Sequence, residues 1–202
     1  MYLYGIMQDF LTQLIAKDQA LFSLINGKWT NLVLDKLMPW FRTSNNWFPF
    51  YAALLIYLFV KWGKRAWKWL IIVALNVTLT DQISSSFFKP FFHRLRPCAD
   101  PAIMHKSRLL IEHCSGGFSF TSSHAANHFG LAMLVFMTLQ PLFKKYTYLF
   151  FIWAATIGYA QIYVGVHYPL DVFVGTCIGL LVGYAMSKLF FKFDSIPNLL
   201  NK

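Results

Sequence analysis

Two histidines and an aspartate are the side chains in this sequence best suited to catalysis. His124 follows a Thr-Ser-Ser run, and His167 precedes Asp171 by four residues. One imidazole can attack an electrophilic centre while another donates a proton to the leaving group. A carboxylate placed beside a histidine can orient the ring and stabilise its protonated form. The pattern therefore predicts nucleophilic catalysis by a pair of histidines, with Asp171 as the orienting group.

Cationic and hydrogen-bonding groups near these histidines indicate that the substrate is an anion such as a phosphate. Lys89 and Arg96 supply positive charge, and a guanidinium can bind two phosphate oxygens at once. Ser122 and Ser123 stand where an apolar helix is expected to begin, and the free N–H groups of a helix N-terminus bind anions. We therefore predict a phosphate site made by these four residues.

Each of these clusters also has a purely structural interpretation. A lysine and an arginine at a membrane boundary often extend their charged ends into the headgroup region. A serine before an apolar helix is a common N-cap, and a histidine can form a local hydrogen-bonded pair with a nearby aspartate. The chemical interpretation rests on the joint occurrence of all three clusters at helix ends that are expected to meet.

The composition indicates that these residues are carried by membrane-spanning helices. Of 202 residues, 57% are hydrophobic, 19% aromatic and only 13% charged, and the mean hydropathy is +0.47. A soluble domain carries about 25% charged residues. A net charge of +10 would suit a nucleic-acid partner, but much of it lies in short clusters between long apolar runs. That distribution is typical of a membrane protein and argues against nucleic-acid binding.

Five apolar segments approach the roughly 20 residues that a helix needs to cross a bilayer. They cover residues 46–60, 67–88, 123–143, 147–166 and 169–189. We therefore predict an all-α integral membrane bundle of about five transmembrane helices. Asp81 lies inside the second segment, about two helical turns before Lys89 and too far away for a direct pair. We expect it to hydrogen-bond to another helix.

Residues 1–45 are expected to form amphipathic helices outside this bundle. Apolar side chains recur at helical spacing from Ile6 to Ile15, which favours a helix lying in the membrane interface. A short span is the alternative, although Lys17 and Asp18 interrupt it. A second amphipathic piece covers about 32–41. The chain thus divides into interfacial helices over 1–45, a transmembrane core over 46–193 and a C-terminal tail over 194–202.

Basic clusters predict which end of the bundle faces the cytoplasm. They follow the first, third and fifth segments, which places them at one end of a five-helix bundle: Lys61, Lys64, Arg65 and Lys68; Lys144 and Lys145; Lys188 and Lys192. Short basic loops stay on the cytoplasmic side. We therefore expect a multi-pass protein of a bacterial inner membrane whose active site opens at the outer membrane face, toward the periplasm.

Small residues and cysteines give two further expectations. Gly175, Gly179 and Gly183 repeat every four residues in the last segment, which predicts a flat stripe that a neighbouring helix approaches closely. Cys98 and Cys114 both lie in the long outer loop. In an oxidising periplasm they could form a disulfide that ties the loop together, or they could remain free thiols.

Together the three clusters resemble the signature of the type 2 phosphatidic acid phosphatase family. The signature reads Lys, six residues, Arg-Pro; then Pro-Ser-Gly-His; then Ser-Arg, five residues, His, three residues, Asp. Its matching positions here are Lys89, Arg96 and Pro97; Ser122 and His124; and His167 and Asp171. Thr121 and Ser123 replace the proline and the glycine of the second part. The resemblance covers about the second to the fifth segment.

The resemblance implies a membrane phosphatase that needs no metal or other cofactor. By this resemblance, His167 would attack phosphorus and form a phosphohistidine, His124 would protonate the leaving group and then help water to hydrolyse the intermediate, and Asp171 would orient His167. The departure is Ala160-Gln161 in place of Ser-Arg. Gln161 can donate hydrogen bonds to a phosphate but brings no charge, and Arg94 is a candidate to compensate.

A site at the membrane surface predicts a lipid substrate with its phosphate in water. Undecaprenyl diphosphate, phosphatidate, phosphatidylglycerophosphate and the phosphates of lipid A all fit this description. One alternative, motivated by Gln161, is a non-catalytic protein that binds or transports lipid phosphates. Another is a vanadium-dependent haloperoxidase, which is disfavoured because such enzymes are soluble. The sequence carries no signal for an oligomeric state.

Overall fold

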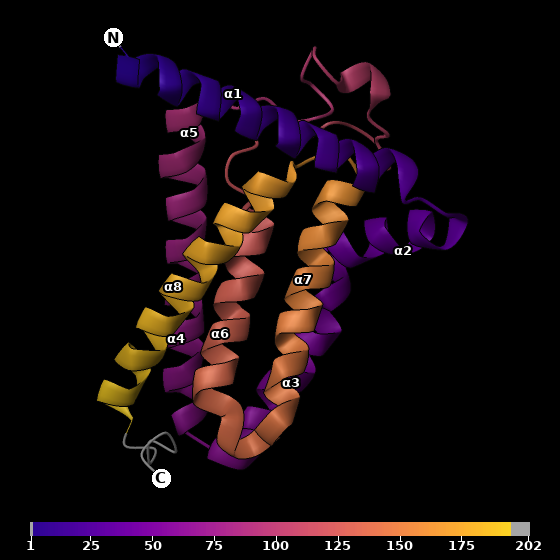
Figure 1. The fold of residues 1–202 in the computed structure, drawn as a ribbon. Coiled ribbons are helices and arrows are strands. Elements are labelled where there is room, and N and C mark those ends of the chain that lie inside the picture. The colour runs from indigo at the N-terminus through magenta and orange to yellow at the C-terminus, as the bar shows by residue number, and fades with distance from the viewer. Residues whose placement is uncertain (1, 195–202) are drawn as a thin grey trace.

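The computed structural model describes residues 2–194, with side chains from residue 5 onward, and every regular element in that range is helical. Helices α3 (Phe48–Trp62), α4 (Arg65–Asp81), α6 (Ser123–Phe143), α7 (Tyr148–Tyr163) and α8 (Pro169–Phe193) lie side by side (Figure 1). Helix α1 (Tyr2–Ser23) lies across the end of this bundle where α8 begins. The expected all-α bundle is confirmed.

The number of membrane crossings stays a prediction. Three helical stretches are long and apolar enough to cross a bilayer: Arg65–Phe92, Ser123–Tyr163 and Pro169–Phe193. The second of these has 41 residues and reverses direction at a 3₁₀ turn (η5, Lys144–Thr147), so it supplies two antiparallel helices, α6 and α7. Helix α3 has 15 residues, which is about 23 Å of helix and shorter than the hydrocarbon core.

The stretch that follows α4 changes its helical pitch before it reaches the first motif. Residues Gln82–Phe88 form a π-helical segment (η3), and a short helix, α5 (Lys89–Phe92), continues from it. His93 then ends the helix in a left-handed conformation with φ of 49°. π-Helical segments often occur at functional sites, and this one carries Ser84 and Ser85 toward the start of α6.

The N-terminal segment packs over the end of the bundle. Helix α1 continues through a π-helical turn (η1, Leu24–Lys28), and α2 (Leu32–Arg42) leads through a 3₁₀ turn (η2, Ser44–Trp47) into α3. Phe22 and Ile25 are buried against Tyr163 and Tyr168. The apolar side chains of the first turns of α1 are exposed instead: Ile6, Met7, Phe10, Leu11 and Ile15. The placement of this stripe in the membrane interface stays a prediction.

The glycine stripe of α8 is a contact surface, as predicted. A Cβ added at Gly175 would meet the carbonyl oxygen of Ser122 at 2.5 Å, and one added at Gly179 or Gly183 would collide with the carbonyl oxygens of Ala126 or Gly130. Only glycine allows such close backbone approach. The contact fixes the start of α6 against the start of α8, which are the two elements that carry His124 and Asp171.

The basic clusters lie at the opposite end of the bundle, where two of their residues bond to the end of α8 and to the residue after it. Lys68 donates to the carbonyl oxygen of Phe193 (2.9 Å), and Arg65 pairs with Asp194 (3.2 Å). The turns between α3 and α4 and between α6 and α7 lie at this end as well (Figure 1). The orientation of this end toward the cytoplasm stays a prediction. Of the expected tail, only Asp194 falls within the described residues; 195–202 lie outside them.

Candidate active site

The three motifs meet in one polar pocket of about 300 Å³ at the end of the bundle that α1 covers. Six of the predicted residues line it: Lys89, Arg96, Ser123, His124, Gln161 and His167. The remaining lining residues are Arg42, Asp81, Ser85 and Ser115. Residues that are far apart in the sequence therefore lie around a cavity large enough for a phosphate group.

His167 is held by the short connection between α7 and α8. The backbone N–H groups of Val166 and His167 both donate to the carbonyl oxygen of Gln161 (3.2 Å each). Gly165 permits the turn because its φ is +91° and because a Cβ there would collide with the carbonyl oxygen of Arg108. The His167 side chain is only 3% exposed. Its position is thus set by the backbone rather than by a mobile side chain.

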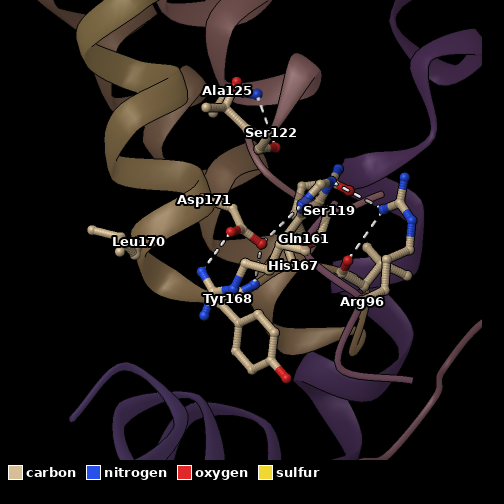
Figure 2. A network of polar contacts seen from close by, with 12 residues as sticks. Arg96, Ser119, Ser122, Ala125, Gln161, His167, Tyr168, Leu170 and Asp171 are labelled. Carbon is tan, nitrogen blue, oxygen red and sulfur yellow. Dashed lines mark hydrogen bonds and ion pairs between the residues drawn. The ribbon is translucent and has the colours of Figure 1, made fainter. Parts of the chain in front are cut away.

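The ring of His167 lies between Asp171 and Arg96 (Figure 2). Nδ1 is 3.4 Å from Asp171 Oδ2, and Nε2 is 3.2 Å from Nη1 of Arg96. A proton on Nδ1 faces the carboxylate, so the Nε2 lone pair points to Nη1 of Arg96, a residue that also lines the pocket. Burial lowers the pKa of His167 to about 4. The imidazole is therefore neutral near pH 7, as a nucleophile must be.

Asp171 has a structural as well as an electrostatic task. Its Oδ2 also accepts the backbone N–H of Tyr168 at the start of α8 (2.8 Å), and its side chain is fully buried. Its backbone carbonyl accepts the N–H of Ser122 (3.0 Å). The residue therefore caps its own helix, orients His167 and fastens the second motif to the third.

Arg94 lies behind His167 rather than in the pocket. Nη1 donates to Asp171 Oδ1 (2.7 Å), Nη2 donates to Asp18 Oδ2 (2.5 Å), and the guanidinium stacks 4.0 Å from the Tyr168 ring centroid. Both of these Nη groups are thus engaged with carboxylates. This arrangement differs from the expectation that Arg94 would compensate for the charge absent at Gln161.

Lys89 reaches the start of α6 through a cluster of hydroxyl groups. Its Nζ donates to Ser123 Oγ (2.9 Å), and Ser85 Oγ lies 3.0 Å from the same oxygen. Ser85 also donates to Asp81 (3.3 Å). Asp81 therefore bonds within its own helical stretch, and the expectation of a partner on another helix is wrong. Lys89 and Asp81 both face the pocket without a direct pair between them.

Arg96 and Ser122 differ in their access to the pocket. Arg96 Nη1 donates to the Val166 carbonyl (3.1 Å), and its buried Nε makes no hydrogen bond within the described residues. Ser122 Oγ instead accepts from the N–H of Ala125 (3.4 Å), so it is the N-cap of α6. The structural interpretation of Ser122 is the one the geometry favours, because its side chain does not line the pocket.

The imidazole of His124 makes no hydrogen bond to any of residues 5–194. Its backbone carbonyl accepts from His128 Nδ1 (2.7 Å), and His128 Nε2 lies 3.3 Å from the Tyr51 hydroxyl. His128 thus braces the first turn of α6 while the His124 ring remains available in the pocket. This arrangement suits a group that exchanges a proton with a bound substrate.

Two charged residues near the site belong to no motif, and sequence reasoning missed them. Arg42 lines the pocket, and its Nε donates to Gln161 Oε1 (3.4 Å). Asp18 pairs with Arg94 and accepts the N–H of Leu170 (2.8 Å). The only signals available were a charge that interrupts an apolar stripe, at Asp18, and an arginine before a polar turn, at Arg42.

The loop between α5 and α6 is closed covalently. Cys98 and Cys114 form a disulfide with a Cα–Cα distance of 5.9 Å, which lies within the range seen for such bonds. Ser115, which lines the pocket, directly follows Cys114, and Arg96 lies two residues before Cys98. The bridge therefore connects two stretches of the loop that both contribute to the pocket wall.

Comparison with known proteins agrees with the resemblance drawn from the motifs. The profile of the PAP2 superfamily matches residues 66–195. A lipid A 4'-phosphatase of Bacteroides thetaiotaomicron is 35% identical over 183 residues, which cover 88% of this chain and 77% of the relative. A lipid A 4'-phosphatase of Porphyromonas gingivalis is 32% identical, and the match covers 84% of this chain but only 64% of that protein.

Solved structures give the same result for the fold. The crystal structure of Aquifex aeolicus LpxE superposes with a TM-score of 0.63 at 31% identity, covering 84% of this chain and 94% of that one. A transmembrane PAP2-type phosphatidylglycerolphosphate phosphatase from Bacillus subtilis superposes with a TM-score of 0.68 at 20% identity, covering 91% and 89%. The second likeness bears on the fold alone.

Proposed function

The chain belongs to the PAP2 superfamily, and from this premise we propose that it is a membrane phosphatase that releases phosphate from a lipid through a phosphohistidine. The observation that carries the proposal is the setting of His167. Its Nε2 faces a pocket with Lys89 and Arg96, and its Nδ1 faces Asp171. A neutral nucleophile, an orienting carboxylate and fixed positive charge are the groups that phosphoryl transfer to a histidine requires.

In the first step, Nε2 of His167 attacks phosphorus as the bond from phosphorus to the lipid oxygen breaks. His124 donates its proton to the departing oxygen, so the lipid leaves as a neutral alcohol or, from a diphosphate, as a less charged phosphate. Asp171 stabilises the positive charge that develops on the imidazole. Lys89 and Arg96 stabilise the equatorial phosphate oxygens, where most of the transition-state charge resides.

In the second step, water replaces His167 on phosphorus. His124, now neutral, takes a proton from the attacking water, the new oxygen–phosphorus bond forms, and the phosphorus–nitrogen bond breaks. Inorganic phosphate leaves, His167 returns to its neutral form, and His124 regains the proton it had given up. The two histidines therefore need different surroundings: His167 is fixed, and His124 is free to meet first the leaving group and then water.

The substrate we propose is lipid A, from whose headgroup the protein would remove a phosphate. Two relatives at 32% and 35% identity carry the name lipid A 4'-phosphatase. An undecaprenyl-diphosphatase of Bacillus subtilis is 24% identical, which makes undecaprenyl diphosphate the next lipid to test. The pocket opens at one end of the bundle, so a substrate with its tail in the bilayer presents its phosphate there. We place this end at the periplasmic face of a bacterial inner membrane.

The experiment measures phosphate release in detergent from lipid A, undecaprenyl diphosphate, phosphatidate and phosphatidylglycerophosphate. His167→Ala should lower kcat/KM by more than about a thousandfold, because the nucleophile is lost. His105→Ala changes an exposed loop histidine and should leave the rate unchanged, and EDTA should not inhibit. If the wild-type protein releases no phosphate from any of these lipids, the proposal fails in favour of a non-catalytic lipid-phosphate binding protein.

A further inference from the structure

We infer that Arg42, the last residue of α2 and outside every motif, is a phosphate-binding residue of this site. The inference rests on the proposed function, since it assigns a further contact to the same bound phosphate. It also makes the N-terminal segment a part of the substrate site rather than only a cover above it.

The position of Arg42 is fixed by Gln161. Nε of Arg42 donates to Gln161 Oε1 (3.4 Å), which holds the plane of the guanidinium at the pocket wall. The two Nη groups make no hydrogen bond or ion pair with any residue in the range 5–194, over which the side chains are described. An arginine bound through Nε alone keeps its two Nη groups for bidentate contact with a phosphate.

The charges around the pocket leave an anion to be bound. Lys89, Arg96 and Arg42 line it together, and Asp81 is the carboxylate among its lining residues. Burial lowers the pKa of Arg42 and of Arg96, because each guanidinium has lost part of its hydration. Cations that are partly withdrawn from water and outnumber the carboxylates around them are stabilised when an anion arrives. Arg42 thereby adds a third positive charge to those of Lys89 and Arg96 around a bound phosphate dianion.

Unpartnered polar atoms at the same wall point to the same ligand. Nε2 of Gln161 and Nε of Arg96 are both buried, and neither has a hydrogen-bond partner within the described residues. Such donors cost free energy unless a ligand satisfies them. Gln161 is thus suited to two contacts: its oxygen accepts from Arg42, and its nitrogen can donate to a phosphate oxygen.

Gln161 and Arg42 together can supply the charge and the hydrogen bonds that a single arginine at position 161 would otherwise bring to the phosphate. An arginine there would place a second guanidinium beside that of Arg42, and like charges at such a distance repel. The charge can therefore come from either position, but not favourably from both. This exclusion gives the inference a test that a merely structural role for Arg42 would not pass.

The test compares Arg42→Ala, Arg42→Lys and the double variant Arg42→Ala with Gln161→Arg. Binding of inorganic orthovanadate, as a phosphate-like probe, is measured by calorimetry in detergent, and kcat/KM is measured on the lipid that the wild type hydrolyses. Arg42→Ala should weaken orthovanadate binding and lower kcat/KM by about 10- to 100-fold, the range for a charged hydrogen bond. Arg42→Lys should lose less, and the double variant should recover part of the loss.

Lys36→Ala is the matched control, because Lys36 is an exposed cation on the same helix; it should leave binding and rate unchanged. Equal affinity of wild type and Arg42→Ala for orthovanadate would overturn the inference. The inference would also be overturned if the double variant had the melting temperature of the wild type but recovered no affinity for orthovanadate. The binding measurement does not depend on turnover, so failure of the inference and failure of the phosphatase proposal can be told apart.

Discussion

The core helices and the N-terminal segment both bring charged side chains to the pocket, but they hold them in different ways. In the core, the motif residues sit at helix ends, where backbone hydrogen bonds, caps and close glycine contacts fix their positions. In the N-terminal segment, Asp18 and Arg42 reach the site from α1 and α2 through their side chains alone. The core is therefore suited to place reacting groups, and the N-terminal segment to adjust the charge around them.

The adjustment depends on how firmly the N-terminal segment is attached. Asn26 is completely buried and bonds to the backbone of Arg108 in both directions (2.8 and 2.7 Å) and to the carbonyl of Tyr163 (2.7 Å). Asp35 accepts from Arg108 (2.6 Å) and from the Tyr163 hydroxyl (2.6 Å). A satisfied polar network of this kind specifies one geometry. It holds α1 and α2 in a defined position relative to the site.

The largest effect expected from this comparison belongs to the core. Asp171→Asn keeps the size of the side chain but removes the charge that stabilises the developing imidazolium, and it also weakens the cap of α8. We expect kcat to fall by about 10²- to 10⁴-fold, as for other carboxylates that orient a catalytic histidine. Phosphate release at saturating lipid measures it.

A matched control for that change is Asp9→Asn, which removes an exposed carboxylate from α1. It should leave the rate within about twofold of wild type, because a solvated charge far from a buried site is screened. If Asp171→Asn proved as active as this control, the carboxylate would not be acting on His167, and the division of tasks between the two regions would need revision.

A smaller effect is expected in the N-terminal segment. Asp18→Asn preserves an acceptor for the N–H of Leu170 but leaves Asp171 as the only carboxylate bound to Arg94. The excess positive charge then opposes the imidazolium of His167, so kcat should fall by about three- to tenfold, roughly one pKa unit of interaction or less. A loss of kcat as large as that of Asp171→Asn would mean that α1, like the core, places the reacting groups.

The sequence predicted the core far better than the N-terminal contribution, for a physical reason. Long apolar runs and helix-end motifs are local patterns, so the bundle, the glycine contact and the gathering of Lys89, Arg96, His124 and His167 could be anticipated. Asp18 and Arg42 acquire their roles only by tertiary contact with residues more than 70 positions away. No local pattern reports such a contact.

Two other differences have local causes. Ser122 was expected to bind phosphate. Its hydroxyl instead accepts the free backbone N–H of Ala125 and caps the helix, as a serine before an apolar helix commonly does. Arg94 was expected to supply charge to the pocket, but two carboxylates engage it first. In both cases a partner within the protein already binds the group that was expected to bind the phosphate.

The smallest effect expected is a change in the titration of His167. In wild type, burial lowers its pKa to about 4, below the ordinary 6.5. Asp18→Asn should lower this pKa further, because Arg94 then carries more uncompensated charge near the ring. NMR spectra of the detergent-solubilised protein with labelled histidines, recorded between about pH 2.5 and 8 so that both midpoints fall within the range, report the ring, and the signal absent from His167→Ala assigns it.

The same shift fixes how stability depends on pH. Between about pH 6.5 and 4 the unfolded chain binds a proton at His167 that the folded protein does not, so the free energy of unfolding falls as the pH is lowered through this window. His105→Ala, which changes an exposed loop histidine, should leave this pH dependence unaltered. A wild-type midpoint near 6.5, or an upward shift in Asp18→Asn, would show that the ring is solvated and that the N-terminal charge does not reach it.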